Sequence, residues 1–488
     1  MIELTLREIA DAVGGRLHNA TGDELITGSV EFDTRKIEKG SLFVALPGER
    51  VDGHDFAAKA VDQGAAAVLA AREVDAPAVI VPPVSEAHSR SVALTGDKDG
   101  SGAAVLAGLA KLARYVVDRL PELKIVGVTG SSGKTSTKDL IAQVLAPLGA
   151  TVAPPGSFNN ELGHPWTVLR ADRDTRHLVL ELSARGLHHI AHLCEVAPPH
   201  IGVVLNVGSA HLGEFGSREG IAQTKGELVE ALPEDGLAVL NADDPLVAAM
   251  ASRTKARVVF VGETASDSPG KAQIRATDIV LDEQARASFH LVTPQGEADV
   301  TLGVHGAHQV GNALSAVAVA LELGATVDQI AQWLGNAQRV SERRMDVRTR
   351  EDGVTVVNDA YNANPESVRA ALKSLASMAR AGTQPRRSWA VLGMMGELGD
   401  SHVSAHDEIG RLAVRLDISR LVVVGDAARP MHQGAHLEGS WGEESVLVPD
   451  VAAAVALLRD ELQPGDVVLV KASKSEALWR VAEELLNT

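Results

Sequence analysis

The residues with the most specific chemical pattern lie in the run Val126–Thr135, VGVTGSSGKT. An apolar segment leads into a glycine-containing turn, and the turn ends in Gly-Lys-Thr at the start of a helical pattern. Glycines let backbone N–H groups approach phosphate oxygens, and a helix N-terminus favours negative charge. Lys134 can reach the β- and γ-phosphates of a nucleotide, and the Thr135 hydroxyl can bind Mg²⁺. The sequence therefore predicts a phosphate loop formed by Gly130, Ser131, Ser132, Gly133, Lys134, Thr135 and Ser136.

This loop is shorter than the Walker A motif, G-x-x-x-x-G-K-[ST], because valine stands at position 128 where that motif has its first glycine. A G-x-x-G-K-T run remains. A Gly-Lys-Thr turn also occurs by chance, but the strand before this one and the helix after it favour phosphate binding. Nucleotide binding alone does not distinguish a kinase, an ATPase and a ligase.

Polar residues follow the predicted strands of the same region. Glu181 closes HLVLEL, Asn206 closes IGVVLN with His211 five residues further on, and Asn241 closes GLAVLN. Because ligands of open α/β sheets bind at the carboxyl ends of strands, we expect Glu181 and His211 beside the phosphate loop, where they would suit a second Mg²⁺. A single Glu or His is more often structural, so the prediction depends on their joint position. Lys225 lies in AQTKGELVE, a pattern typical of a solvated helix face.

Strands and helices alternate through most of the chain, which predicts three α/β domains with mostly parallel sheets covered on both faces. Residues 1–84 predict a small α/β domain. Residues 85–102 are polar, Gly-rich and aperiodic, which indicates a linker or loop insertion. Residues 103–336 predict a central P-loop-type domain. Residues 337–488 predict a Rossmann-like doubly wound domain without the G-x-G-x-x-G run of a dinucleotide site.

The central block combines two kinds of strand. Short apolar runs predict buried parallel strands at residues 124–129, 177–182, 201–206 and 236–241. Residues 272–304 alternate in hydrophobicity instead, which predicts antiparallel strands at one edge. Helical patterns are found at residues 103–118, 134–146, 307–323 and 326–335.

The composition excludes several classes of protein. The 488 residues carry a net charge of -18 and only 3% aromatic residues, which argues against a general nucleic-acid binder. Cys194 is the single cysteine, so no intrachain disulfide is possible. The N-terminal MIELTLREIA lacks the apolar region of a signal peptide, and the alanine-rich stretches are interrupted by charge. We therefore expect no membrane insertion and a cytoplasmic location.

These motifs together resemble those of the Mur ligase family, and the resemblance extends over all three blocks. Phe32-Asp-Thr-Arg35 resembles the family's UDP-binding segment, and Asn159-Asn160 resembles a substrate-contact segment. His308-Gln-Val-Gly-Asn312 is similar to the adenine-contacting start of a helix, and Arg344 matches an arginine between the central and C-terminal domains. Asn358–Pro365, NDAYNANP, resembles the signature of the branch that adds D-alanyl-D-alanine. In this family the short G-x-x-G-K-T loop is normal.

The resemblance implies a role for each candidate residue. The UDP-linked substrate would contact Asp33, Thr34, Arg35, Asn159 and Asn160. ATP would contact the phosphate loop, His308, Asn312, Arg344 and Asp359. The dipeptide would contact Asn362 and Asn364. Catalysis would depend on Lys134, Glu181, His211 and Lys225, and two Mg²⁺ ions would be held by Thr135, Glu181 and His211. The family's counterpart of Lys225 can be carbamoylated, which converts a cation into a carboxylate-like ligand.

The resemblance also implies an ATP-dependent carbon–nitrogen ligase that adds D-alanyl-D-alanine to UDP-N-acetylmuramoyl-tripeptide in peptidoglycan precursor synthesis. A peptide carboxylate would take the γ-phosphate of ATP, and the dipeptide amine would then displace phosphate from the acyl phosphate. The enzyme would be a monomer whose domains close around the site. Ser183 and His189 stand where the family commonly has a glycine and an acidic residue, so we expect altered local geometry after Glu181.

Two other interpretations fit parts of the pattern. A different Mur ligase or a folylpolyglutamate synthetase would share the phosphate loop, but Tyr361–Pro365 and Asp33–Arg35 disfavour both. A nucleotide-regulated binding module would need the phosphate loop but could dispense with Glu181 and His211. Neither the pattern nor the resemblance distinguishes lysine from diaminopimelate at the third position of the peptide substrate.

Overall fold

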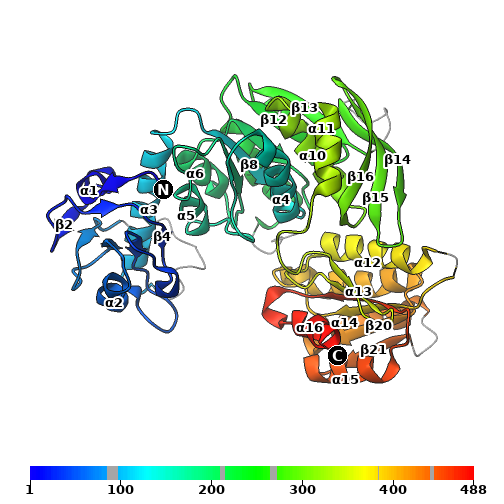
Figure 1. Ribbon diagram of the computed structural model, residues 1–488. Helices are drawn as coiled ribbons and strands as arrows, with labels where there is room; N and C mark the ends of the chain where they lie inside the picture. The colour runs from blue at the N-terminus through cyan, green and yellow to red at the C-terminus, as the bar shows by residue number, and fades with distance from the viewer. Residues whose placement is uncertain (85–96, 209–214, 264–271, 383, 440–443, 488) are drawn as a thin grey trace. The chain divides into compact units, whose positions relative to one another are not determined.

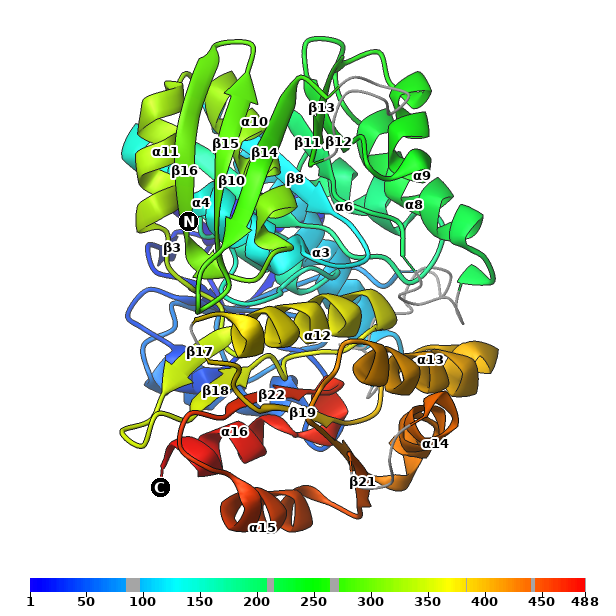
Figure 2. The same ribbon diagram turned by 90° about the vertical axis from the view of Figure 1, so that its right-hand side faces the viewer.

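The chain forms two compact units, and each is described by itself (Figures 1 and 2). The computed structural model describes residues 1–84, 97–208, 215–263, 272–382, 384–439 and 444–487. The first unit comprises residues 1–128, 145–202 and 230–236, and the second comprises residues 129–144, 203–229 and 237–488. Within the described ranges, no helix is long and apolar enough to cross a membrane.

A five-stranded sheet forms the N-terminal part of the first unit, in the order β2-β7-β6-β5-β4. Its strands are β2 (Arg16–His18), β4 (Val30–Glu31), β5 (Leu42–Val44), β6 (Ala67–Ala70) and β7 (Ala78–Ile80), with only β2 antiparallel to its neighbour. Helix α2 (Ala57–Asp62) buries two alanines against this sheet. Helix α1 (Leu6–Val13) begins at a capping box formed by Thr5 and Glu8. β1 (Leu4–Thr5) pairs with β3 (Leu25–Ile26).

A nine-stranded sheet has the order β16-β15-β14-β13-β12-β11-β8-β10-β9. β8 (Lys124–Thr129), β9 (Thr151–Val152), β10 (His177–Glu181), β11 (Ile201–Val204), β12 (Leu237–Asn241), β13 (Arg257–Gly262) and β14 (Ile274–Leu281) are its first seven strands along the chain. β15 (Arg286–Thr293) and β16 (Gly296–His305) follow β14 in antiparallel pairing. The antiparallel edge predicted for residues 272–304 is therefore confirmed. The strands that pair in parallel are short apolar runs, as expected for strands buried on both faces.

Eight α-helices of the described residues accompany these strands. They are α3 (Ser101–Val117), α4 (Lys134–Leu145), α5 (Gly163–Val168), α6 (His189–Val196), α8 (Arg218–Glu230), α9 (Pro245–Ala248), α10 (Gln309–Glu322) and α11 (Val327–Asn336). Of these, α3, α4, α10 and α11 lie close to the four predicted positions. Helix α4 forms because Leu140, Ile141 and Val144 share one buried face behind the polar first turn. Residues 85–96 of the predicted linker lie outside the described residues. Helix α3 begins at Ser101, so the last two residues of the predicted linker belong to this helix.

The C-terminal sheet has the order β17-β18-β22-β19-β20-β21. Its strands are β17 (Asp346–Thr349), β18 (Thr355–Asn358), β19 (Ser388–Leu392), β20 (Arg420–Val424), β21 (Ser445–Val448) and β22 (Val467–Lys471), all parallel except β17. Figure 2 shows α12 (Pro365–Arg380) and α13 (His402–Arg415) on one side of this sheet, and α15 (Val451–Glu461) and α16 (Trp479–Leu486) on the other. Two separate apolar cores match these two layers. The predicted α/β fold class with a doubly wound C-terminal domain is confirmed.

Three C-terminal elements were not predicted. β17 and β21 are four residues long, and their sequences, DVRT and SVLV, are too short for a periodic signal. Helix α14 (Arg429–Glu438) is polar, but Gly434 lets it pack closely on α13: a Cβ atom there would lie 2.2 Å from the carbonyl oxygen of Asp407. The last helix, α16 (Trp479–Leu486), begins only after Ala477, which has a left-handed backbone conformation with φ 49°.

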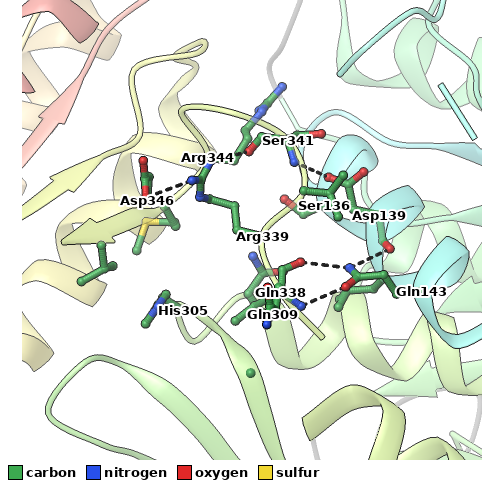
Figure 3. Close-up of a pocket in the computed structure, with 16 residues that line it drawn as sticks. Ser136, Asp139, Gln143, His305, Gln309, Gln338, Arg339, Ser341, Arg344 and Asp346 are labelled. Carbon is green, nitrogen blue, oxygen red and sulfur yellow. Dashed lines mark hydrogen bonds and ion pairs between the residues drawn. The ribbon is translucent and has the colours of Figure 1, made fainter. Parts of the chain in front are cut away.

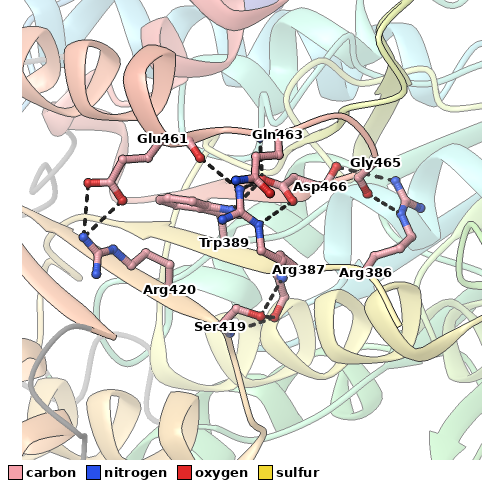
Figure 4. A network of polar contacts seen from close by, with 10 residues as sticks. Arg386, Arg387, Trp389, Ser419, Arg420, Glu461, Gln463, Gly465 and Asp466 are labelled. Carbon is pink, nitrogen blue, oxygen red and sulfur yellow. Dashed lines mark hydrogen bonds and ion pairs between the residues drawn. The ribbon is translucent and has the colours of Figure 1, made fainter. Parts of the chain in front are cut away.

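The amino ends of the C-terminal strands are joined by an ion network around the buried Asp466 (Figure 4). Asp466 accepts two hydrogen bonds from Arg387, at 2.6 and 2.9 Å, and one from the indole N–H of Trp389 at 3.0 Å. Arg386 donates to the Gly465 carbonyl oxygen at 2.6 Å. This network fixes the amino edge of β18, β19 and β22, whereas ligands of such sheets bind at the opposite, carboxyl edge.

His406 fixes one loop at that carboxyl edge. Its Nε2 accepts a hydrogen bond from the backbone N–H of Met395 at 2.9 Å, and its Nδ1 lies 2.6 Å from the carbonyl oxygen of His402. With Nε2 accepting, Nδ1 carries the proton and donates it. The side chain is fully buried, and burial lowers the pKa of His406 from 6.5 to about 4. A neutral imidazole therefore holds the loop after β19.

We predict that acid destabilises the protein partly through His406. The unfolded chain protonates this histidine near pH 6.5 but the folded chain only near pH 4, so stability falls as pH drops through that interval, by about 2 kcal/mol between pH 7.5 and pH 5. His406→Gln keeps an acceptor for Met395 without titrating, and thermal unfolding across pH should show a smaller loss for this variant. His192→Gln, at an exposed position, is the control. Equal pH dependence in His406→Gln and the wild type would contradict the prediction.

Candidate active site

The phosphate loop connects β8 to α4, as predicted. Gly133 has φ 81°, a conformation that favours glycine. A Cβ atom on Gly133 would also lie 2.7 Å from the side-chain oxygen of Asn312, so the position has no room for a larger residue. The backbone carbonyl of Gly133 accepts the N–H of Thr137 at 2.9 Å as the first helical bond. The loop is therefore locked into the turn that opens α4.

Asn206 holds the other end of this loop. Its side-chain oxygen accepts the backbone N–H groups of Ser131 and Ser132, at 3.0 and 2.9 Å, and its side-chain amide donates to the Ser132 carbonyl at 3.2 Å. Two polar residues at and just after the end of β12 hydrogen-bond to the residues on either side of Asn206. Asn241 donates to the Leu205 carbonyl at 2.9 Å, and Asp244 accepts the Val207 N–H at 2.7 Å. These residues shape the loop rather than form a metal site of their own.

The ammonium of Lys134 folds back onto its own loop, where it donates to the Gly130 carbonyl at 2.6 Å. Thr135 is buried at 4% exposure, and its hydroxyl oxygen accepts a hydrogen bond from Arg344 at 3.3 Å. The Arg344 guanidinium lies over the ring of Tyr361, 4.1 Å from its centroid, which orients it through a cation–π contact. Its buried Nε–H has no hydrogen-bond partner. A cation with a spare donor thus lies beside the phosphate loop, which suits an anionic ligand.

A cavity of about 290 Å³ lies next to the first turns of α4 (Figure 3). Its walls are formed by α4, the end of β16, the start of α10 and the segment after α11; its lining includes Ser136, His305, Gln309, Arg339 and Arg344. Polar contacts hold this segment to α4. Gln143 donates to and accepts from Gln338, and Asp139 accepts the Ser341 N–H at 3.2 Å. The cavity is polar and adjoins the phosphate loop.

His308 and Asn312 lie at the start of α10, near the same loop. Asn312 is buried and donates to the Gln309 side-chain oxygen at 2.9 Å, while its own oxygen faces Gly133. His308 is half-buried, its Nδ1 has no hydrogen-bond partner, and burial lowers its pKa. A neutral imidazole with a free ring nitrogen can bind the edge of a base.

The signature NDAYNANP begins at the end of β18 and reaches the phosphate loop. Asn364 caps α12 through a bond from the Ser367 N–H at 2.8 Å, and its amide donates to the Ser131 carbonyl at 3.3 Å. Asp359 is buried and accepts the Met345 N–H at 3.1 Å. Asn362 contributes its carbonyl oxygen to a bond from Lys471 at 3.0 Å. The signature therefore contacts both the loop and the segment that carries Arg344.

Lys225 does not lie on a solvated helix face. It is buried in α8 at 8% exposure, and burial, followed by repulsion from Lys134, lowers its pKa well below the ordinary value. The solvated-face prediction for AQTKGELVE is wrong, because Thr224, Gly226 and Glu227 are buried together with Lys225. His211, the predicted imidazole ligand, lies outside the described residues.

The remaining candidates belong to the first unit. Glu181 closes β10 at 2% exposure and accepts a hydrogen bond from the Asn159 side chain at 2.8 Å. Asn160 accepts the Gly163 N–H at 2.9 Å and so shapes the start of α5. Asp33 and Arg35 pair with each other, and the pairing lowers the pKa of Asp33 to about 2. Among the described residues, no group of three or more His, Cys, Asp or Glu side chains is placed to hold a metal ion.

Family models match three segments of the chain: the Mur ligase family catalytic domain at residues 28–112, the Mur ligase middle domain at residues 128–320, and the Mur ligase glutamate ligase domain at residues 343–474. The chain belongs to the Mur ligase family. This Mur ligase is 58% identical over 505 residues to the UDP-N-acetylmuramoyl-tripeptide–D-alanyl-D-alanine ligase of Mycobacterium tuberculosis, covering 100% of the chain and 98% of the relative. It is 33% identical to the Escherichia coli ligase of the same name, covering 99% of each chain.

Solved structures support the same relationship. The structure of this Mur ligase matches that of MurF from Acinetobacter baumannii with a TM-score of 0.84 and 30% identity, covering 100% of this chain and 99% of the other. It matches MurF from Thermotoga maritima, solved in complex with ADP, with a TM-score of 0.76 and 30% identity, covering 95% and 98%. The predicted family and three-domain α/β fold are confirmed.

In its second unit this Mur ligase brings together most residues predicted to contact ATP. The phosphate loop itself carries Lys134 and Thr135, and Arg344 and Asn312 lie beside it. Glu181 and Asn159 contact each other in the first unit. Sequence reasoning noted Asn206 only as a strand-end residue and missed its clamp on the loop. It assigned no role to Tyr361 or Lys471. The side-chain contacts of all three join segments far apart in the sequence, which periodicity does not reveal.

We predict that Asn206→Ala loosens the phosphate loop without unfolding the protein. The substitution removes the side-chain acceptor of two backbone N–H groups, of which Ser131 alone keeps a second bond, to the Asn206 carbonyl at 3.1 Å. Amide hydrogen exchange at Ser132 should therefore rise about tenfold, in line with the loss of about one net hydrogen bond. Asn206→Asp, which keeps the acceptor, should show a smaller increase. Unchanged exchange in Asn206→Ala would show that the clamp does not order the loop.

Proposed function

We propose that this Mur ligase joins D-alanyl-D-alanine to UDP-N-acetylmuramoyl-tripeptide and converts ATP to ADP and phosphate. The observation that supports it most directly is the bond from Arg344 to Thr135, which places a cation with a spare donor at the phosphate loop. Similarity over the full chain length to ligases with this name supports the choice of substrates. The third residue of the peptide, lysine or diaminopimelate, stays open.

The nucleotide is proposed to bind with its phosphates at Gly130–Ser136. The neighbouring cavity, at about 290 Å³, is near the lower end of the usual range for small-ligand sites, roughly 300–1,000 Å³, and its lining includes both Ser136 of the loop and Arg344. In this arrangement His308 and Asn312 contact adenine, and Asp359 contacts the ribose. Lys134 leaves the Gly130 carbonyl and binds the β- and γ-phosphates.

The other two substrates are assigned to two further groups of residues. Asp33, Thr34, Arg35, Asn159 and Asn160 are proposed to contact the UDP-linked peptide. Asn362 and Asn364 are proposed to contact the dipeptide, a role supported by the bond from Asn364 to the phosphate loop. We further propose a monomer in the cytoplasm with domains at residues 1–84, 103–336 and 337–488, which bind the UDP substrate, ATP and the dipeptide respectively.

The reaction needs two displacements. A carboxylate oxygen of the tripeptide attacks the γ-phosphorus, and the bond to the β-phosphate oxygen breaks to release ADP. The free amine of the dipeptide then attacks the acyl carbon, the carbon–oxygen bond to phosphate breaks, and the nitrogen loses a proton. Both reactants of the first step are anions, so Lys134 and Arg344 have to offset their repulsion.

The candidate ligands fit Mg²⁺, which prefers oxygen ligands. The Thr135 hydroxyl and the Glu181 carboxylate are both buried, and a buried carboxylate favours a cation nearby. We propose that Thr135, Glu181 and His211 hold two Mg²⁺ ions. When bound, magnesium neutralises charge on the transferred phosphate.

Phosphate release should require both acceptor substrates. We expect the wild type to release phosphate from ATP only with UDP-N-acetylmuramoyl-tripeptide and D-alanyl-D-alanine together, and mass spectrometry should detect the pentapeptide product. Glu181→Ala should reduce the rate at least about 1,000-fold, because it removes a charge that acts in the transition state.

The same assay separates a ligase from a nucleotide-regulated binding module. A binding module would retain ATP binding but release no phosphate in response to the dipeptide, and Glu181→Ala would change nothing. Glu195→Ala, at an exposed glutamate of α6, is the matched control and should keep wild-type activity.

Lys225 should react with carbon dioxide. Its pKa is lowered by burial, so more of the side chain is the neutral amine, whose nitrogen attacks CO₂ and loses a proton to give a carbamate. Protein equilibrated with ¹³C-bicarbonate should show a carbamate carbon signal by NMR. The signal should be absent from Lys225→Arg, which should also lose activity, and present in Lys255→Arg, at an exposed lysine. A signal that survives Lys225→Arg would place the modification elsewhere.

A further inference from the structure

Lys471 ends β22 at the carboxyl edge of the C-terminal sheet. Its side chain is buried at 2% exposure. The ammonium donates to the carboxylate oxygen Oδ2 of Asp359 at 2.6 Å, to the carbonyl oxygen of Asp359 at 3.3 Å, and to the carbonyl oxygen of Asn362 at 3.0 Å. An ammonium has three N–H donors, so these three bonds use all of them. Lys471 therefore has no donor left for a ligand in this arrangement.

The three acceptors belong to two parts of the proposed site. Asp359 is the proposed ribose contact, and Asn362 opens the segment proposed to bind the dipeptide. The backbone between them, residues 359–362, is held as a turn around one ammonium group. We propose that Lys471 is a positioning residue that couples the nucleotide contact at Asp359 to the dipeptide segment at Asn362, an inference that rests on the proposed function.

The contacts of Asp359 extend this coupling to the phosphate loop. Its second oxygen, Oδ1, accepts the backbone N–H of Met345 at 3.1 Å. The preceding residue, Arg344, donates to Thr135 and stacks on Tyr361, which lies inside the turn held by Lys471. A continuous set of contacts thus runs from the dipeptide segment through Lys471 and Asp359 to the first turn of α4. Each Asp359 oxygen keeps a second lone pair for a ribose hydroxyl.

A merely structural role is the alternative, and the same sheet provides its comparison. Asp466 forms an ion pair with Arg387 at the amino edge of β22; its carboxylate is as buried as Lys471, at 3% exposure, while the Arg387 side chain is 41% exposed. That pair joins strand ends and no proposed ligand contact. Loss of either pair should destabilise the domain: without Lys471 the buried Asp359 carboxylate loses its partner, and without the Asp466 carboxylate the charge-assisted bonds from Arg387 and the bond from Trp389 are weakened. Only loss of the Lys471 contacts should change how substrates bind.

The test compares Lys471→Met and Asp466→Asn by steady-state kinetics and thermal unfolding. We expect Lys471→Met to raise KM for D-alanyl-D-alanine and for ATP about tenfold each, as for one lost charge-assisted hydrogen bond. KM for the UDP-linked tripeptide should not change, since its proposed contacts lie in the first unit. Asp466→Asn should also lower the melting temperature but leave all three KM values within about twofold.

Two further variants cover the case in which Lys471→Met does not fold. Lys471→Arg keeps the charge but replaces three tetrahedral donors with a planar fork, and should show the same KM pattern in weaker form. In the double variant Asp359→Asn with Lys471→Met no unpaired buried charge remains, so it should fold and retain the raised KM for the dipeptide. Wild-type KM values in any folded Lys471 variant would overturn the coupling alone. Absence of dipeptide-dependent phosphate release in the wild type would overturn the proposed function and the coupling with it.

Discussion

Positive charge is concentrated around the phosphate loop of a protein whose net charge is -18. Lys134 and Arg344 contact the loop, Lys225 is buried close enough to be repelled by Lys134, and Lys471 is buried close enough to be repelled by Arg344. Charges of one sign held together away from water are costly unless partners offset them. Lys471 has Asp359 as its partner. The phosphates of the proposed nucleotide would add negative charge beside the cations nearest the loop.

In the C-terminal domain, charged side chains at the two edges of the sheet are paired in different ways. At the amino edge, Asp466, Arg387 and Trp389 form closed contacts that leave little capacity for a ligand. At the carboxyl edge, short loops follow β18, β19 and β22 and are tied to each other through backbone bonds, such as that from Ser473 N–H to the Met394 carbonyl at 2.9 Å. Parallel strands place these loops side by side, so residues distant in sequence share one site.

Local patterns predicted what short segments determine by themselves. The phosphate loop, its helix and the antiparallel edge follow from glycine placement and hydrophobic periodicity within about ten residues. The burial of Lys225 was not predictable in this way, because Thr224, Lys225 and Glu227 form a polar run that tertiary packing nevertheless buries. The pairing of Lys471 with Asp359 spans 112 residues, and only the adjacency of β18 and β22 in the sheet brings the two together. The family resemblance identified Asp359 through its motif, but Lys471 stands outside that run.

Lys134 illustrates how a site can be ready for a charged ligand without leaving a polar group unsatisfied. Its ammonium donates to the Gly130 carbonyl, a bond within the loop itself. A bond to a neutral carbonyl contributes about 1 kcal/mol, whereas a bond to an ionised phosphate is roughly twice as strong. Under the proposed nucleotide binding, exchange of the carbonyl for a phosphate oxygen would therefore be favourable. Because Gly130 also belongs to the loop, the same exchange frees its carbonyl without disturbing Asn206, whose clamp on Ser131 and Ser132 keeps the backbone in place throughout.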